Sequence, residues 1–191
     1  MAILLLLKVV HTLHCVRPSL AAQSFCFACI SALVFLNPCD QQQPVHLVTA
    51  GCVMRSPLTI STDISRATAE TLSTLGHDEL IAVNQDPLPT PARLIERSQR
   101  QREGPAMTPT FDAWVGPLHD NCSVVLVVNL GSGALRQQLQ FDADLQLSLE
   151  TYRVRDMWGR QDLGVMRSGI DVEVQEAHDN ALYKLCPPSV N

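Results

Sequence analysis

Aromatic side chains are scarce in this sequence, since Phe, Tyr and Trp together make up 5% of its 191 residues. Few rings are therefore available to stack against sugars or nucleic-acid bases. An excess of positive charge is also lacking, because 14 Lys and Arg face 19 Asp and Glu and give a net charge of −5. We expect no nucleic-acid partner, because no basic stripe is present to meet phosphates.

An unbroken apolar run of about 20 residues, the length that a membrane-spanning helix needs, is lacking in residues 1–50. The stretch "SFCFACISALVFLN" follows Lys8 and Arg17, and its length suits the apolar region of a signal peptide or a buried helix. The uncharged window Pro18 to Cys39 could just span a bilayer, although serines and a glutamine dilute it. We leave 1–50 unassigned, as a signal or anchor segment or as a stretch outside any folded domain. Membrane association stays open, and a secreted or secretory-pathway location is expected.

Five of the seven cysteines lie in the first 52 residues, and the odd count leaves at least one thiol unpaired in a monomer. The spacing of Cys26 and Cys29 resembles half of a zinc site. Their neighbours are apolar and include no turn former, so we interpret them as small apolar residues of a hydrophobic helix. No metal and no cofactor are therefore predicted, and the disulfide pairing stays open. Asn121-Cys122-Ser123 is a sequon, which makes Asn121 a candidate for N-glycosylation.

The pattern from residue 51 to residue 88 predicts a strand followed by two helices. "SPLTIS" is a short apolar strand, and Asp63 or Ser65 can cap the helix that follows it. The second helix, "ELIAVN", begins after Asp78 and is ended by Pro87. Strand followed by helix is the order of a βα unit in a parallel sheet or barrel.

The residue composition and the periodicity of apolar residues change after this unit. The segment 89–110 is rich in proline with little periodicity, so we expect a linker. "FDAWVGPL", "SVVLVVNL" and "ALYKL" read as strands. Leu145, Leu147 and Leu149 alternate with polar residues, as do Val172 and Val174, and this period of two predicts further strands. We therefore expect a small antiparallel β domain over 111–188.

Six strings in this order resemble the C-terminal part of the α-galactosidases of glycoside hydrolase family 27. They are "MRSPLTISTDIS", "ELIAVNQDPL", "AWVGPL", "VVLVVNL", "YRVRDMWGRQDLG" and "EAHDNALYKL", and the resemblance covers the chain from Ala50 to Pro188. The resemblance implies an α+β fragment, in which the last strand and helix of a (β/α)8 barrel (51–88) are followed by an antiparallel β-sandwich domain. It also implies that "NQDPL" identifies the family and the place in the chain where the last barrel helix ends, and that the Asp86 side chain bonds local backbone.

The family's reaction is the hydrolysis of terminal α-galactosyl residues, so the resemblance implies α-galactoside-containing carbohydrate as the substrate of intact relatives. The implied mechanism retains configuration and uses two carboxyls about 5–5.5 Å apart. Asp40 is the only acidic residue before Asp63, so we assign no catalytic residue and expect no activity from this chain. Asp63 itself ends the predicted strand, where barrel active sites lie, and is a candidate barrel-rim residue.

A non-catalytic β-sandwich module that binds a glycan or a partner is the alternative. Such a module should expose a cluster of aromatic rings, whereas Trp114 and Trp158 lie in strings that resemble the family's strands. We therefore predict that both belong to a core, and that the ring of Trp158 packs across the interior of the sandwich.

Overall fold

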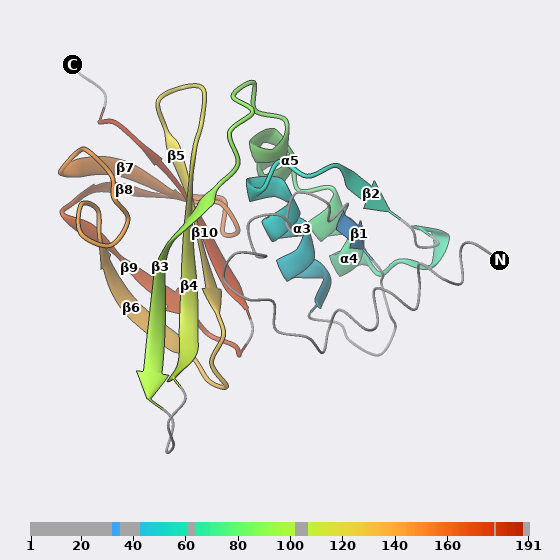
Figure 1. Ribbon diagram of the computed structural model, residues 1–191. Coiled ribbons are helices and arrows are strands. Elements are labelled where there is room, and N and C mark those ends of the chain that lie inside the picture. Colours follow the sequence, from blue (N-terminus) through green and yellow to red (C-terminus); the bar gives the residue numbers. More distant parts are fainter. Residues whose placement is uncertain (1–31, 35–42, 61–63, 102–106, 178, 189–191) are drawn as a thin grey trace. The chain divides into compact units, whose positions relative to one another are not determined.

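The computed structural model describes residues 32–34, 43–60, 64–101, 107–177 and 179–188, which all lie in one compact unit, Ser31–Asn191 (Figure 1). The helices are α3 (Gln43–Val53), α4 (Ala69–Leu75) and α5 (Asp78–Asn84), with a short 3-10 helix at Ile64–Arg66. The strands are β1 (Ala32–Val34), β2 (Leu58–Ile60), β3 (Arg93–Gln101), β4 (Met107–Pro117), β5 (Ser123–Asn129), β6 (Leu135–Gln140), β7 (Thr151–Asp156), β8 (Gln161–Arg167), β9 (Gly169–Val174) and β10 (Asn180–Cys186). Among these helices, none is both long enough and apolar enough to cross a membrane.

Two antiparallel sheets form the β domain. One has six strands in the order β3-β4-β5-β10-β7-β8, and the other pairs β6 with β9. The apolar core lies between them: Val127 and Leu185 contribute from the larger sheet, Leu139 and Val172 from the smaller one. The alternation that the sequence shows at Val172 and Val174 is confirmed, because both side chains are buried and their neighbours are exposed.

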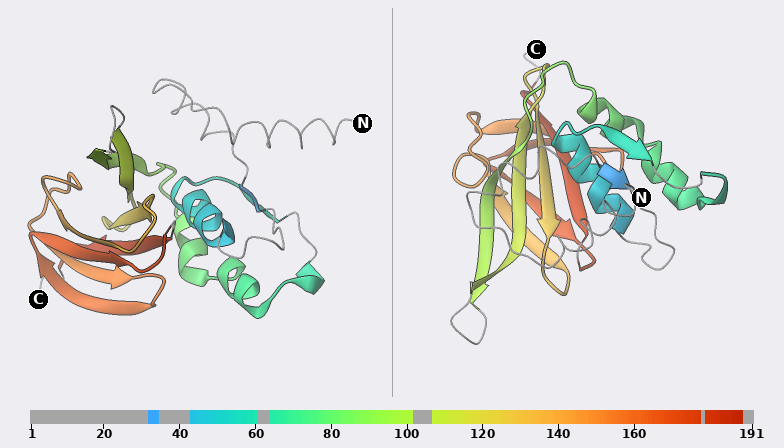
Figure 2. Two further views of the ribbon diagram at one scale, coloured as in Figure 1. Left: turned by 90° about the horizontal axis from the view of Figure 1, so that it is seen from below. Right: turned by 45° about the vertical axis from the view of Figure 1, so that its right-hand side comes forward.

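Strand β5 is apolar along its length because both of its faces are covered. Val125 and Val127 point into the sandwich core, whereas Val124 and Leu126 belong to a second apolar cluster on the opposite face of the sheet. Helices α3 and α5 form the other side of that second cluster, and Figures 1 and 2 show them beside the strands. A strand covered on both faces loses the polar alternation of a half-exposed strand, which explains the continuous run "VVLVV".

A small α/β segment precedes the sandwich. Strands β1 and β2 pair in parallel, and helix α3 lies between them in the chain. Val48, Cys52 and Val53 of α3 are buried in the second cluster together with Leu80 of α5. This segment and the sheet therefore share one apolar core.

Two expected boundaries differ from the structure. The segment 89–110 is not a linker throughout, because it contains β3 and the start of β4, which pair with each other. Backbone pairing with β4, interrupted by two register shifts, holds β3 in the sheet. The periodicity of its side chains in the sequence does not reveal this strand. The expected boundary at residue 50 falls inside α3, so the last residues of 1–50 belong to the folded unit.

Other local expectations were wrong. Leu145 lies in a turn after β6, and Leu147 and Leu149 lie in the irregular chain that follows it rather than in a strand; Gln146 between them has a positive φ of 54°. Leu145 is buried and Leu147 packs against the sandwich core, whereas Leu149 is exposed, so apolar side chains can be buried here without a strand. Thr68, not Asp63 or Ser65, caps α4, with its hydroxyl oxygen accepting from the Thr71 amide.

Trp158 does not lie in the sandwich interior. Strand β7 ends at Asp156, so the period of two that buries Tyr152 and Val154 does not extend to it. The half-buried ring packs instead against the second cluster, between sheet and helices, as does Trp114.

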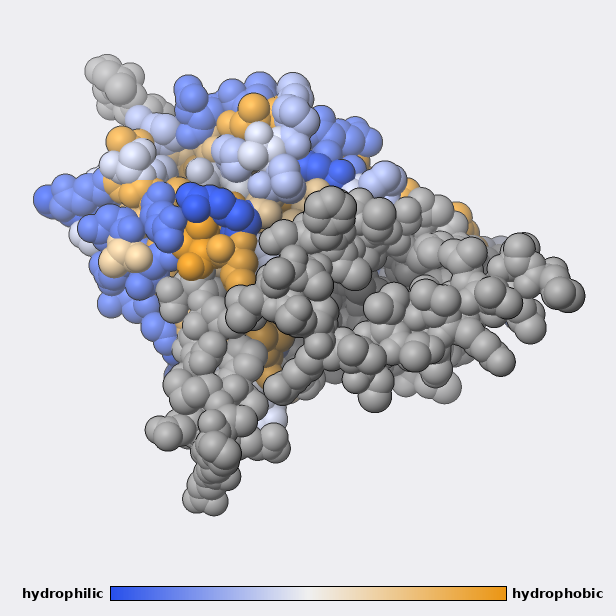
Figure 3. Space-filling model, viewed as in Figure 1, coloured by the Kyte–Doolittle hydropathy of each residue, from blue (hydrophilic) through white to orange (hydrophobic). Residues whose placement is uncertain are grey.

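The surface over the strands that Figure 3 shows in colour is mainly hydrophilic, with smaller apolar patches.

Candidate functional site

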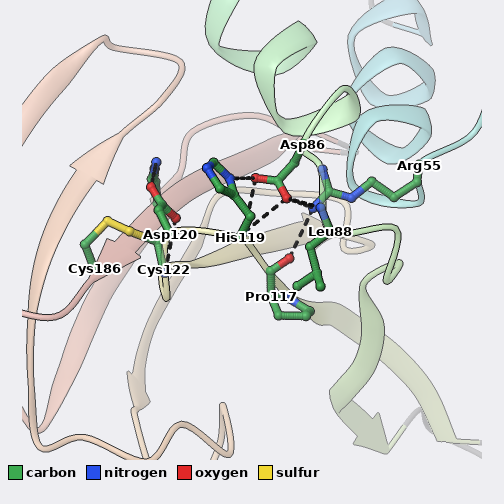
Figure 4. Close-up of polar contacts among 9 residues, drawn as sticks. Arg55, Asp86, Leu88, Pro117, His119, Asp120, Cys122 and Cys186 are labelled. Carbon is green, nitrogen blue, oxygen red and sulfur yellow. Dashed lines mark hydrogen bonds and ion pairs between the residues drawn. A yellow bond between two sulfur atoms is a disulfide. The ribbon is translucent and has the colours of Figure 1, made fainter.

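The carboxylate of Asp86 is the centre of a cluster of polar contacts that joins residues far apart in the chain (Figure 4). Asp86 lies two residues after the end of α5, and its side chain is 7% exposed. Its Oδ1 accepts from the amides of Leu88 (2.9 Å) and His119 (3.1 Å), and its Oδ2 lies 2.9 Å from His119 Nδ1. Because His119 belongs to the turn between β4 and β5, the carboxylate ties the end of the α/β segment to the sheet.

Arg55 reaches the same cluster from the end of α3. Its Nη2 donates to the carbonyl oxygen of Pro117 (3.1 Å) and lies 3.8 Å from Asp86 Oδ1. The side chain is 8% exposed, and Nε and Nη1 have no hydrogen-bond partner among the described residues. Its backbone has a positive φ of 57°. Arg55 is thus a buried cation whose charge is balanced mainly by Asp86.

The charges in this cluster depend on one another. Burial alone would raise the pKa of the Asp86 carboxyl, but the hydrogen bonds from His119 and Leu88 and the charge of Arg55 outweigh it and hold that pKa below its usual value. Burial lowers the pKa of Arg55, and Asp86 opposes this. Burial also raises the pKa of the Cys52 thiol to about 12 despite the nearby Arg55. At neutral pH Asp86 is therefore ionised and Cys52 is a neutral thiol.

Two further residues of the string "ELIAVNQDPL" strengthen the junction, by which we mean the contact of the α/β segment with the sheet. Asn84 Nδ2 donates to the carbonyl oxygen of Ser56 (2.9 Å), which holds α5 against the chain that leads into β2. Glu79 accepts two hydrogen bonds from Arg155 of β7, at 2.8 and 2.7 Å. The hydrogen bond from Arg155 is the main reason that the pKa of Glu79 lies below its usual value. Helix α5 is thus bonded at both ends to other parts of the unit.

This arrangement fastens elements of the chain together. Asp86 is buried and its oxygens are occupied by donors of the chain itself, so it is not placed to attack a substrate. The one metal-like grouping in the described residues, Asp120 with Cys122 and Cys186, holds no thiolates because the two cysteines form a disulfide. We find no candidate metal or cofactor ligands among the described residues.

A shallow pocket lies beside α4 and the turn after β7. His77 is buried there, and neither ring nitrogen has a hydrogen-bond partner among the described residues. Its ring centroid lies 5.2 Å from that of Trp158, edge to face, while Trp158 Nε1 donates to Asn180 Oδ1 (2.9 Å). Burial lowers the pKa of His77, so the imidazole is neutral at pH 7 and acts as packing.

Comparison with known proteins identifies the domain. A model of the alpha galactosidase C-terminal beta sandwich domain matches residues 108–185. Alpha-galactosidase 3 from Arabidopsis thaliana is 34% identical over 139 residues, which make up 73% of this chain and 30% of that protein. The crystal structure of alpha-galactosidase I from Mortierella vinacea superposes with a TM-score of 0.67 at 25% identity, covering 80% of this chain and 38% of that chain. The chain belongs to the family 27 α-galactosidases, in their C-terminal portion.

A further family structure, the α-galactosidase from Saccharomyces cerevisiae with raffinose, superposes with a TM-score of 0.68. Its identity is 19%, and the match covers 81% of this chain and 45% of that chain, so it supports the fold alone. The chain spans about 30% of the length of the Arabidopsis relative. The predicted resemblance to the C-terminal part of the family is therefore confirmed.

The structure describes some of the predicted site residues and leaves others outside the described ranges. Asp63 lies outside the described residues, as do Cys26 and Cys29. Asn121 is exposed in the turn between β4 and β5. Asp86 bonds local backbone as predicted, through Leu88, and also binds residues far along the chain.

Sequence reasoning missed Arg55 and His119, the partners of Asp86, and the disulfide between Cys122 and Cys186. A weak signal existed, because Arg55 and His119 flank the strings "SPL" and "GPL" that the resemblance singled out.

Proposed function

We propose that this chain supplies the end of the barrel and the C-terminal β domain of an α-galactosidase, with residues 51–88 carrying the last strand and helix of a (β/α)8 barrel. The parallel pairing of β1 with β2 across helix α3 carries this proposal. Parallel strands joined by a helix are the repeating unit of such a barrel. The apolar contact of α3 and α5 with the sheet adds support, because it joins the two parts through one core.

The reaction proposed for the whole protein is hydrolysis of terminal α-galactosyl residues, because relatives that this chain matches are named α-galactosidases. The retaining mechanism needs two carboxyls about 5–5.5 Å apart. We assign neither to the described residues, in which Asp86 and Glu79 are committed to ion pairs with arginines. The role proposed for this part of the protein is to complete and support the barrel.

The chain of 191 residues is therefore proposed to be inactive by itself. The test is hydrolysis of an aryl α-galactoside by the purified chain, with the Mortierella vinacea enzyme as positive control. We expect no turnover above that of buffer. Turnover that a single Asp substitution abolishes would contradict the proposal.

A location in the secretory pathway is also proposed. The Cys122–Cys186 disulfide supports it, since disulfides persist in oxidising compartments and are rare in the cytosol. Mass spectrometry of the protein, alkylated as the cells that make it are lysed, tests this, with an oxidised pair expected. Free thiols at both positions would contradict it.

A further inference from the structure

The sequon at Asn121 lies in the tight turn between β4 and β5. The Leu118 amide donates to the carbonyl oxygen of Cys122 (2.9 Å) and closes this turn. Asn121 is exposed with a positive φ of 59°, a conformation that asparagine tolerates better than most residues. Its side chain makes no hydrogen bond to another described residue. The Asn121 side chain is therefore exposed and is not held by other described residues.

The next two residues of the sequon are held firmly. Cys122 is buried and bonded to Cys186 of β10 (Figure 4). Ser123 lies between two strands, paired with Pro117 of β4 and Leu185 of β10. A glycosyltransferase must engage the asparagine amide and the serine hydroxyl together, which requires this segment to leave the sheet. The folded, oxidised chain therefore cannot present the sequon.

We propose that Asn121 is N-glycosylated and that its occupancy is set by competition with closure of the Cys122–Cys186 disulfide. The donor is an oligosaccharide linked to a lipid diphosphate. The Asn121 Nδ2 forms the bond to C1 of the first sugar, the bond from C1 to the phosphate oxygen breaks, the lipid diphosphate leaves, and the amide loses one proton. The inference rests on the secretory location proposed above.

The order of synthesis gives this competition its direction. Cys186 follows Cys122 by 64 residues. At about 5–20 residues per second, roughly 3–13 s pass between the synthesis of the two cysteines. During that interval Cys122 cannot bond Cys186 and β10 is not yet present to pair with Ser123, so the sequon is accessible. Once the disulfide closes, an unmodified Asn121 stays unmodified.

The test uses the full chain behind a cleavable signal sequence, expressed in a eukaryotic secretory host. Occupancy is measured as the gel shift removed by an endoglycosidase. We expect partial occupancy in the unaltered chain and loss of the shift in Asn121→Gln. Two variants should raise occupancy toward completion: Cys186→Ser, and Cys122→Ala, which keeps an Asn-x-Ser sequon.

A matched control separates the disulfide from general misfolding. Leu182→Ala removes a fully buried side chain from β10 but leaves the sequon and both cysteines intact, so its occupancy should equal that of the unaltered chain. An equal rise in Leu182→Ala and Cys186→Ser would overturn the role of the disulfide. Equal occupancy in the unaltered chain and Cys186→Ser would also overturn it, and no glycan in any variant would overturn the proposal as a whole. The gel shift does not depend on α-galactosidase activity, so these failures are distinct from a failure of the proposed function.

Discussion

Removing the Asp86 carboxylate should destabilise the protein more than removing any exposed acidic group. In Asp86→Ala the amides of Leu88 and His119 lose their acceptor, and the buried Arg55 keeps only its bond to the Pro117 carbonyl. Breaking a buried ion pair by removing one partner typically costs about 3–5 kcal/mol, because a buried charge is left uncompensated. This is a large part of the roughly 5–15 kcal/mol by which a domain is stable.

Thermal unfolding followed by circular dichroism measures the effect. At about 2–4 °C per kcal/mol for a chain of this size, Asp86→Ala should lower Tm by about 6–20 °C. Asp86→Asn should lower it less, because the amide oxygen still accepts from Leu88. The control is Asp78→Ala, which removes an exposed ion pair with Arg160 and should cost no more than about 0.5 kcal/mol. A Tm for Asp86→Ala equal to that of Asp78→Ala would refute the anchoring role.

Three further outcomes are expected. The pKa of Asp86 lies below its usual value in the folded state, so its contribution is present above about pH 4 and is lost as pH falls through the folded pKa; Asp86→Asn should flatten the acid side of a stability profile, and an unchanged slope would count against this. Burial lowers the pKa of His77, so its protonation favours the unfolded state, and stability should fall as pH drops below about 6.5. His77→Phe should weaken that fall when urea midpoints at several pH values are compared, and an identical dependence would argue for another group. Trp158→Ala should cost less than the about 3–5 kcal/mol typical of a buried aromatic, because the ring is half-buried; a loss above that range in urea unfolding would restore a core position.

The strands whose side chains alternate could be predicted from the sequence, because each such strand buries one face. Val172 and Val174 in β9 show this. The same rule failed at Leu145 and Leu147, where a turn and the irregular chain after it bury apolar side chains without a strand. It also missed β3, whose place in the sheet depends on backbone pairing with β4.

Only part of the polar cluster around Asp86 could be predicted from the sequence. The string "NQDPL" identified Asp86 as a residue that bonds local backbone, and its bond to Leu88 lies within the string. Arg55 and His119 lie about 30 residues away on either side, at 31 and 33 positions in the sequence. No local pattern links such residues, because tertiary folding brings them together. The disulfide between Cys122 and Cys186 was unpredictable on the same grounds, since seven cysteines allow many pairings.

The central claim is that this chain forms the supporting C-terminal part of an α-galactosidase. A chimera tests it most directly, in which residues 43–191, from α3 onward, replace the matching part of the Mortierella vinacea enzyme. We predict that this chimera hydrolyses an aryl α-galactoside, as should a control that carries the matching part of the Arabidopsis relative. An active control beside a chimera of this chain that unfolds cooperatively but shows no turnover would contradict the claim.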